Sequence, residues 1–292
     1  MAPSGSPTVR RRRLAAELKR LRGNRTGGEV ARALGWSATK ISRAESGHES
    51  LPPTEIERLV NYYAVEEPLR GRLLELAEDA ARRGWWEEYA DANPPQLLEF
   101  IGLEAEAESS LQWQADSVPG LMQTEAYARS LQATFQTMVR TIPPGIIDRF
   151  LETRMRRQDR LTRDPVLKLS TVIDEAVLLR RVGDDRLMRE QLQRLADLSE
   201  LPNVDLRVLP LDRELALLAS SYTIMSFGSR TAAGAVGLGD IVSTENLNTE
   251  LYIEGETDIQ LYRLFFEAAA QASLSPADTR GLIMATIRRA WS

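Results

Sequence analysis

The stretch from Thr26 to Gly47 constrains this chain most, because it predicts two short helices joined by a tight turn. Thr26 and Glu29 stand three residues apart, which is the spacing of a capping box at a helix start. Gly35 is expected to end this helix, since glycine takes the left-handed backbone of a C-terminal cap without strain. Ser37 then caps the second helix. The stretch therefore predicts a compact helical hairpin.

The second helix of this hairpin, from Ser37 to Ser46, has two different faces. Ile41 and Ala44 supply the inner, apolar face. Small side chains allow close approach to DNA, hydroxyls reach phosphates or bases, and arginine can fork onto guanine. These are the residue types of the outer face, which carries Ala38, Thr39, Ser42 and Arg43. The pattern favours a helix that lies in the major groove of DNA.

The hairpin resembles the helix-turn-helix of the xenobiotic-response-element family of bacterial repressors, whose pattern is roughly E-V-A-x-x-L-G-x-S-x-x-x-I-S-x-x-E-x-G. The family usually has a glutamine early in the first helix, which often holds a phosphate; this chain has Gly27 and Gly28 there, so the resemblance does not carry that contact over. The alternative is a helical hairpin without a DNA role. The matching positions are Glu29, Val30, Ala31, Leu34, Gly35, Ser37, Ile41, Ser42, Glu45 and Gly47.

The expected partner is double-stranded DNA, bound by a homodimer whose two helices lie on half-sites about one DNA turn apart. Arg43 is expected to read a base, and Ala38 to meet a thymine methyl group. Thr39, Lys40 and Ser42 complete the contacts of the second helix. The phosphates of the DNA backbone are expected to be held by Arg10, Arg11, Arg12, Arg13 and Arg25. Thr26 and Ser37, at the two helix starts, are further expected DNA-binding residues.

The charge distribution supports a nucleic-acid partner, although the formal net charge is −5. Residues 1–48 carry 11 basic and 3 acidic side chains, and the remainder carries 26 basic and 39 acidic ones. Such asymmetry is typical of a basic DNA-reading part joined to an acidic body. An ordinary solvated basic tail is the alternative.

Composition limits the other function classes. The chain has no cysteine, which excludes disulfides and thiolate chemistry, and its one histidine, His48, makes a poor metal site by itself. We expect no metal and no cofactor. The sequence contains no run of 18 apolar residues and no secretory signal, so we expect a cytoplasmic, nucleoid-associated protein without a membrane partner.

The length of 292 residues suggests about two domains. We expect a disordered tail over 1–7, a helix-turn-helix domain with a following helix over 8–84, and a hinge over 85–95. Trp85 and Trp86 are expected to wedge this hinge against a core, with ligand stacking as the alternative. Residues 96–292 are expected to form an α+β regulatory or interaction domain.

The predicted fold class is therefore an N-terminal all-α helix-turn-helix domain joined to a larger α+β domain, with a mixed or antiparallel sheet and flanking helices. Strands are predicted at 109–115, 166–173, 204–209, 221–228, 235–242 and 251–253, and late helices at 185–199, 256–272 and 276–290. An arginine-rich helix after Pro144 is either a solvated, salt-bridged face or an anion or acidic-partner site. It carries or precedes Arg149, Arg154, Arg156, Arg157, Arg160 and Arg163.

No catalytic constellation is visible, and we expect no enzyme. Asp174 and Glu175 are adjacent in sequence and do not converge, so Glu175 is expected to be a helix-start carboxylate. No helix follows Gly234, Gly237 and Gly239 to form a phosphate-binding loop. The candidates for ligand binding, if the larger domain has a pocket, are Trp113, Glu175 and Tyr222.

A second resemblance spans nearly the whole chain. The segments VPGLMQTEAYAR (118–129), DEAVLLRRVG (174–183), MREQLQRLADL (188–198), PNVDLRVLP (202–210) and LSPADTRGLI (274–283), with GWW at 84–86, look like the WhiJ-type regulators of actinomycetes. This resemblance implies a dimeric transcriptional regulator whose large C-terminal domain senses a partner or a signal. Some members are antitoxin-like and sequester a small partner protein encoded by a neighbouring gene. The resemblance carries over no ligand residues.

Overall fold

The computed structural model describes residues 7–291 except 48–50, 83, 140–142, 215–218, 229–238 and 247–248. Its contacts divide the chain into two compact units. The N-terminal unit comprises Met1–Glu87, Glu99–Glu106 and Phe227–Leu238, and the C-terminal unit comprises Glu88–Leu98, Ala107–Ser226 and Gly239–Ser292. The expected tail over 1–7 lies outside the described residues except for Pro7, and so do His48, Gly234 and Gly237.

The N-terminal unit is helical, as the sequence predicts. Its helices are α1 (Pro7–Arg22), α2 (Gly27–Leu34), α3 (Ala38–Ser46), α4 (Pro53–Tyr62) and α5 (Leu69–Ala80). Helix α1 packs against both α3 and α5. The apolar core collects one buried stripe from each helix, including Leu18, Val30, Ile41, Ile56 and Leu73. These residues recur at helical spacing, so burying them fixes which face of each helix is left outside.

The C-terminal unit contains a six-stranded sheet with the strand order β3-β2-β1-β4-β5-β6. The first three strands along the chain pair in parallel, and β4, β5 and β6 continue the sheet by antiparallel pairing. The prediction of a mixed sheet is thus confirmed. The strands are β1 (Ser109–Gln114), β2 (Lys168–Asp174), β3 (Val204–Leu209), β4 (Tyr222–Ser226), β5 (Ile241–Glu245) and β6 (Glu250–Ile253).

The strand predicted over 235–242 is misplaced, because β5 begins only at Ile241 and residues 229–238 lie outside the described part of the chain. The other five strands lie within two residues of their predicted starts. The glycine-rich, apolar composition before Ile241 led to the early placement. Pairing with β4 instead uses the run from Ile241 to Thr244.

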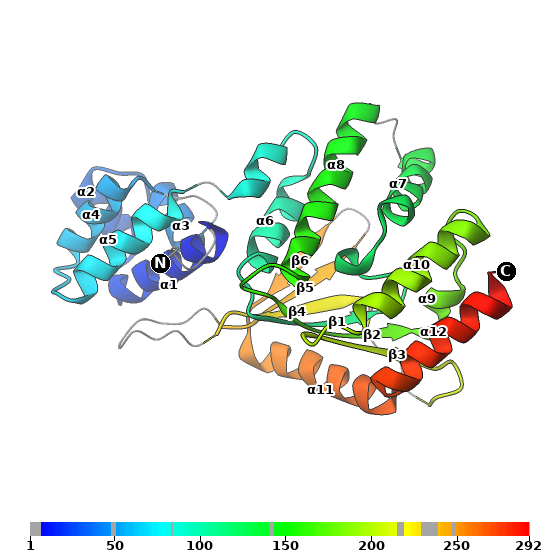
Figure 1. Ribbon diagram of the computed structural model, residues 1–292. Coiled ribbons are helices and arrows are strands. Elements are labelled where there is room, and N and C mark those ends of the chain that lie inside the picture. The colour runs from blue at the N-terminus through cyan, green and yellow to red at the C-terminus, as the bar shows by residue number, and fades with distance from the viewer. Residues whose placement is uncertain are drawn as a thin grey trace. The chain divides into compact units, whose positions relative to one another are not determined.

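Helices cover both faces of this sheet. Figure 1 shows α11 on one face and α8 and α10 on the other. The predicted late helices are confirmed, and Ser275 caps α12 with Pro276 at its first position. The longer helices are α6 (Pro95–Glu104), α7 (Glu125–Val139), α8 (Pro144–Arg157), α10 (Asp185–Leu198), α11 (Glu256–Ala272) and α12 (Pro276–Ala290), with a short α9 (Glu175–Leu179).

Candidate nucleic-acid interface

The turn between α2 and α3 has the predicted caps. Thr26 accepts a hydrogen bond from the Glu29 backbone N–H at 3.2 Å, and its own N–H donates to the Glu29 carboxylate at 2.6 Å. This bond from the Thr26 N–H, together with one that the Thr26 hydroxyl donates to the same carboxylate at 2.9 Å, holds the pKa of Glu29 below its usual value. Gly35 has φ 69°, and Ser37 Oγ accepts from the Lys40 N–H at 3.2 Å. The angle between the helices is therefore set by local chemistry.

Helix α3 divides into the two predicted faces. Ile41 and Ala44 are buried in the core of the N-terminal unit. The opposite face is exposed, and it carries Ala38, Thr39, Ser42 and Arg43. A short helix with small and hydroxyl residues outside can approach a groove floor closely, and its arginine can reach base edges or phosphates.

Two ion pairs brace α3. Arg22 of α1 donates from Nε to both carboxylate oxygens of Glu45, at 2.7 and 3.0 Å, and this hydrogen bonding raises the pKa of Arg22. Lys40 Nζ lies 2.5 Å from the Glu55 carboxylate and 4.5 Å from the centre of the Trp36 ring. The ammonium group of Lys40 is thus held by α4, whereas the other predicted outer residues face outward. The sequence pattern includes Glu45 as a family position, but it does not indicate that Arg22 is the partner of Glu45.

The N-terminal arginines have internal partners. Arg11 pairs with Glu87 at 3.2 Å, Arg12 pairs with Glu99, and Arg13 donates to the carbonyl of Phe227 at 3.3 Å. All of these contacts lie within the N-terminal unit. The three side chains are half-buried, so in this arrangement they stabilise the fold instead of standing free for phosphates.

Arg25 stands at the start of α2, close to the glycines that replace the family's glutamine. Its guanidinium carbon lies 6.0 Å from the centre of the Tyr62 ring and 5.8 Å from that of Tyr63, within cation–π range. An open hollow of about 510 Å³ is lined by Asn24, Arg25, Glu29 and Tyr62. Neither Asn24 nor Tyr62 belongs to the helix-turn-helix pattern, so the pattern does not predict a role for them.

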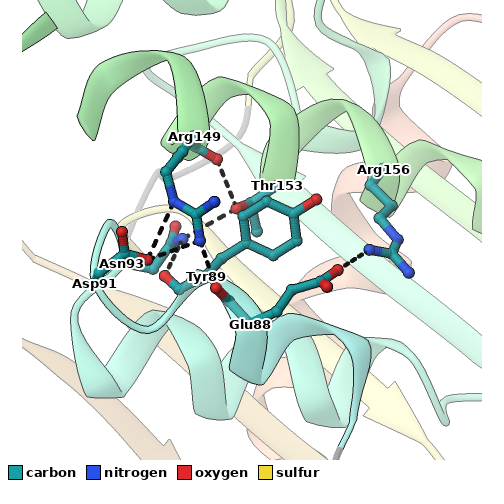
Figure 2. A network of polar contacts seen from close by, with 7 residues as sticks. All are labelled: Glu88, Tyr89, Asp91, Asn93, Arg149, Thr153 and Arg156. Carbon is teal, nitrogen blue, oxygen red and sulfur yellow. Dashed lines mark hydrogen bonds and ion pairs between the residues drawn. The ribbon is translucent and has the colours of Figure 1, made fainter. Parts of the chain in front are cut away.

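The expected hinge is bound to α8 by a polar network, which Figure 2 shows. Arg149 donates to Asp91 Oδ1 from Nε at 3.2 Å and from Nη2 at 2.9 Å, and it also bonds the carbonyl of Glu88. Arg156 pairs with the Glu88 carboxylate. These ion pairs favour the salt-bridged interpretation of the arginine-rich helix. All these residues belong to the C-terminal unit.

Buried polar groups complete this network. Asn93 Nδ2 donates to the carbonyl of Tyr89 and to Thr153 Oγ1, both at 3.0 Å, and Thr153 donates in turn to the carbonyl of Arg149 at 2.8 Å. Tyr89 is buried, with the Arg149 guanidinium 5.0 Å from its ring centre. The segment Glu88–Asn93 is thereby fastened to the middle of α8.

Two of the three ligand candidates lie in the core, and the third lies at a helix start. Trp113 is 0% and Tyr222 is 2% exposed, both in the core between the sheet and α11. The indole N–H of Trp113 donates to the carbonyl of Ala219 at 3.2 Å. The Tyr222 hydroxyl donates to the backbone carbonyl of Tyr262 at 2.8 Å. Glu175 begins α9, as expected, and accepts from the Leu211 N–H at 2.9 Å.

Within the described residues, no cluster of three or more histidine, cysteine, aspartate and glutamate side chains could hold a metal ion. Across the same residues, no helix has the length and apolar character needed to span a membrane.

The capped hairpin, its buried inner face and the exposed outer face of α3 define a helix-turn-helix protein, and residues 13–73 match the family described as a helix-turn-helix domain. The chain is thus a DNA-binding regulator with a large C-terminal domain. Residues 97–285 match the family described as a domain of unknown function, DUF5753, and the chain belongs to that family. Searches of curated proteins and of solved structures gave no match.

Proposed function

We propose that this protein is a sequence-specific transcriptional regulator that reads DNA through the outer face of α3. The observation that carries the proposal is the braced position of α3, whose inner face is buried and whose outer face is exposed. Thr39, Ser42 and Arg43 are the proposed base and phosphate contacts, and Ala38 is the proposed contact to a thymine methyl group.

The other expected DNA contacts are proposed to act in different ways. Arg25 is the proposed phosphate contact beside α2, where the family's glutamine is replaced. Thr26 and Ser37 accept backbone N–H groups, and the hydroxyl proton of Ser37 can still be donated to phosphate. The hydroxyl of Thr26 donates to the Glu29 carboxylate at 2.9 Å, so it would contact phosphate only by exchanging that partner. Lys40 is proposed to position α3 through Glu55. Arg11, Arg12 and Arg13 would contact phosphate only by exchanging their internal partners.

A gel-shift titration against the DNA upstream of the protein's own gene tests this assignment. Arg43→Ala is expected to cost about 1–3 kcal/mol of binding free energy and to relax sequence preference. Arg186→Ala is the matched control, because it removes one exposed arginine from the C-terminal unit. If Arg43→Ala and the control bind alike, α3 is not the reading helix.

We further propose that the C-terminal domain senses a partner protein or a small molecule and that the chain acts as a homodimer, in the cytoplasm and at the nucleoid. This proposal includes domain boundaries near residues 84 and 95. It also includes an affiliation with the WhiJ-type regulators of actinomycetes. It assigns no catalytic step to the chain. Sedimentation velocity tests the dimer, and a monomer at the concentration that binds DNA would contradict it.

An antitoxin-like role is the second candidate function. Beyond residue 48 the chain has 39 acidic and 26 basic residues. This excess of negative charge suits a basic partner and favours the role. In this role the chain sequesters a small partner protein encoded by a neighbouring gene. Co-expression of the two genes tests this role. A complex that survives about 0.5 M salt would support it, because surface charges are screened at that salt concentration and would not hold the complex together alone.

A further inference from the structure

Helix α11 has apolar residues on two opposite sides. Ile259, Phe266 and Ala269 are buried, and the helix lies against β1, β2, β4 and β5. Leu261 and Leu264 are 62% and 51% exposed on the other side. A surface helix normally has apolar residues only on the face that it turns to the core. The second apolar face is therefore not explained by the fold of the C-terminal unit.

The exposed residues of this face follow a regular spacing. Steps of four, three, four and three residues separate Thr257, Leu261, Leu264, Ala268 and Gln271, and all five are exposed. This is the spacing of the a and d positions in a coiled coil, where one helix packs its seam against another. The leucines occupy the centre of the seam, and smaller or polar residues stand at its ends.

The charges beside this seam have one sign. In this register the exposed acids Asp258 and Glu267 take an e and a g position, which flank the seam. Arg263, the one basic residue of α11, is half-buried, pairs with Asp240 and donates to Ser226 Oγ at 3.2 Å. A second copy of this chain would bring the same carboxylates to the seam. Because flanking charges select the partner of a coiled-coil helix, the seam fits a helix flanked by lysine or arginine.

We propose that the outward seam of α11 docks an amphipathic helix of a partner protein that carries basic residues beside its apolar stripe. This inference rests on the proposed role of the C-terminal domain in sensing a partner. The α11 seam offers a rigid platform, since the opposite face of the helix is anchored in the core beneath it (Figure 1).

The test uses a labelled synthetic peptide about three heptads long, with leucine at its a and d positions and lysine at e and g. Fluorescence anisotropy measures its binding to the full chain. We expect binding to the wild type and at least about tenfold weaker binding to Leu261→Ser/Leu264→Ser, because two apolar contacts are lost. Leu179→Ser/Leu211→Ser is the matched control, since those leucines are 45% and 60% exposed elsewhere.

Four results would overturn the inference. They are no binding of the lysine peptide, equal binding by the two double variants, equal binding of a peptide with glutamate at e and g, and a wild-type dimer that Leu261→Ser/Leu264→Ser converts to monomer. The last result would assign the seam to a second copy. A gel shift on the same samples separates the proposals, because the seam variant should bind DNA as the wild type does.

Discussion

Glu250 gives the C-terminal unit a stability that depends on pH. It begins β6, lies directly opposite Glu245 in the sheet, and accepts a hydrogen bond from Ser243 Oγ at 2.6 Å. Burial, together with the neighbouring carboxylate of Glu245, raises the pKa of Glu250 from 4.5 to about 7. In the folded protein this side chain therefore keeps its proton up to about pH 7.

The sign of the effect follows from this raised pKa. Below pH 4.5 the carboxyl is protonated in both the folded and the unfolded state, and it costs no stability. Between pH 4.5 and about 7 the unfolded chain releases the proton first, so stability falls as pH rises. The rise of the pKa from 4.5 to about 7 corresponds to about 3 kcal/mol of unfolding free energy. Since Glu250 is only partly buried, we expect a cost of about 1–3 kcal/mol above pH 7.

Glu250→Gln removes this cost and keeps an oxygen that can accept from Ser243. Urea unfolding should show the variant to be more stable than the wild type by about 1–3 kcal/mol at about pH 8, and no more stable at about pH 4. Glu267→Gln on the exposed face of α11 is the control and should change little at either pH. A gain that is the same at both pH values, or a loss at the higher one, would refute this reasoning.

Three further substitutions test the local arguments. Gly35→Ala should destabilise the N-terminal unit by about 1 kcal/mol through backbone strain alone, since no atom lies within 4 Å of the added methyl group; thermal unfolding measures this, and an unchanged melting temperature would contradict the cap. Glu45→Gln should cost about 1–3 kcal/mol by breaking the ion pair with Arg22, and it should weaken DNA binding together with stability; a loss of binding at full stability would instead mean that Glu45 acts directly at the DNA. Asn93→Ala should cost about 1–3 kcal/mol in urea unfolding, because two buried hydrogen bonds are lost; a loss below about 0.3 kcal/mol would show that the network in Figure 2 holds little energy.

The helix-turn-helix could be predicted from sequence because its determinants are local. A capping box, a left-handed glycine and a serine cap each act within three or four residues, so Thr26, Gly35 and Ser37 carry the geometry by themselves. The buried face of α3 follows from helical spacing in the same way.

Partners that lie far apart in the chain were not predictable. Arg11 meets Glu87, which is 76 residues away, and composition alone made its charge look available for phosphate. Trp113 and Tyr222 looked like pocket residues because aromatic side chains suit both cores and ligands. Their core position depends on how β1 and β4 pair and on α11, which no local pattern specifies.

Genome-wide mapping of the DNA bound by the wild type and by Arg43→Ala tests the central claim most directly. We predict that the wild type occupies a limited set of sites sharing one sequence, that Arg43→Ala loses these sites, and that Arg186→Ala retains them. Occupancy without a shared sequence, or the same sites for Arg43→Ala as for the wild type, would contradict the claim that α3 reads DNA.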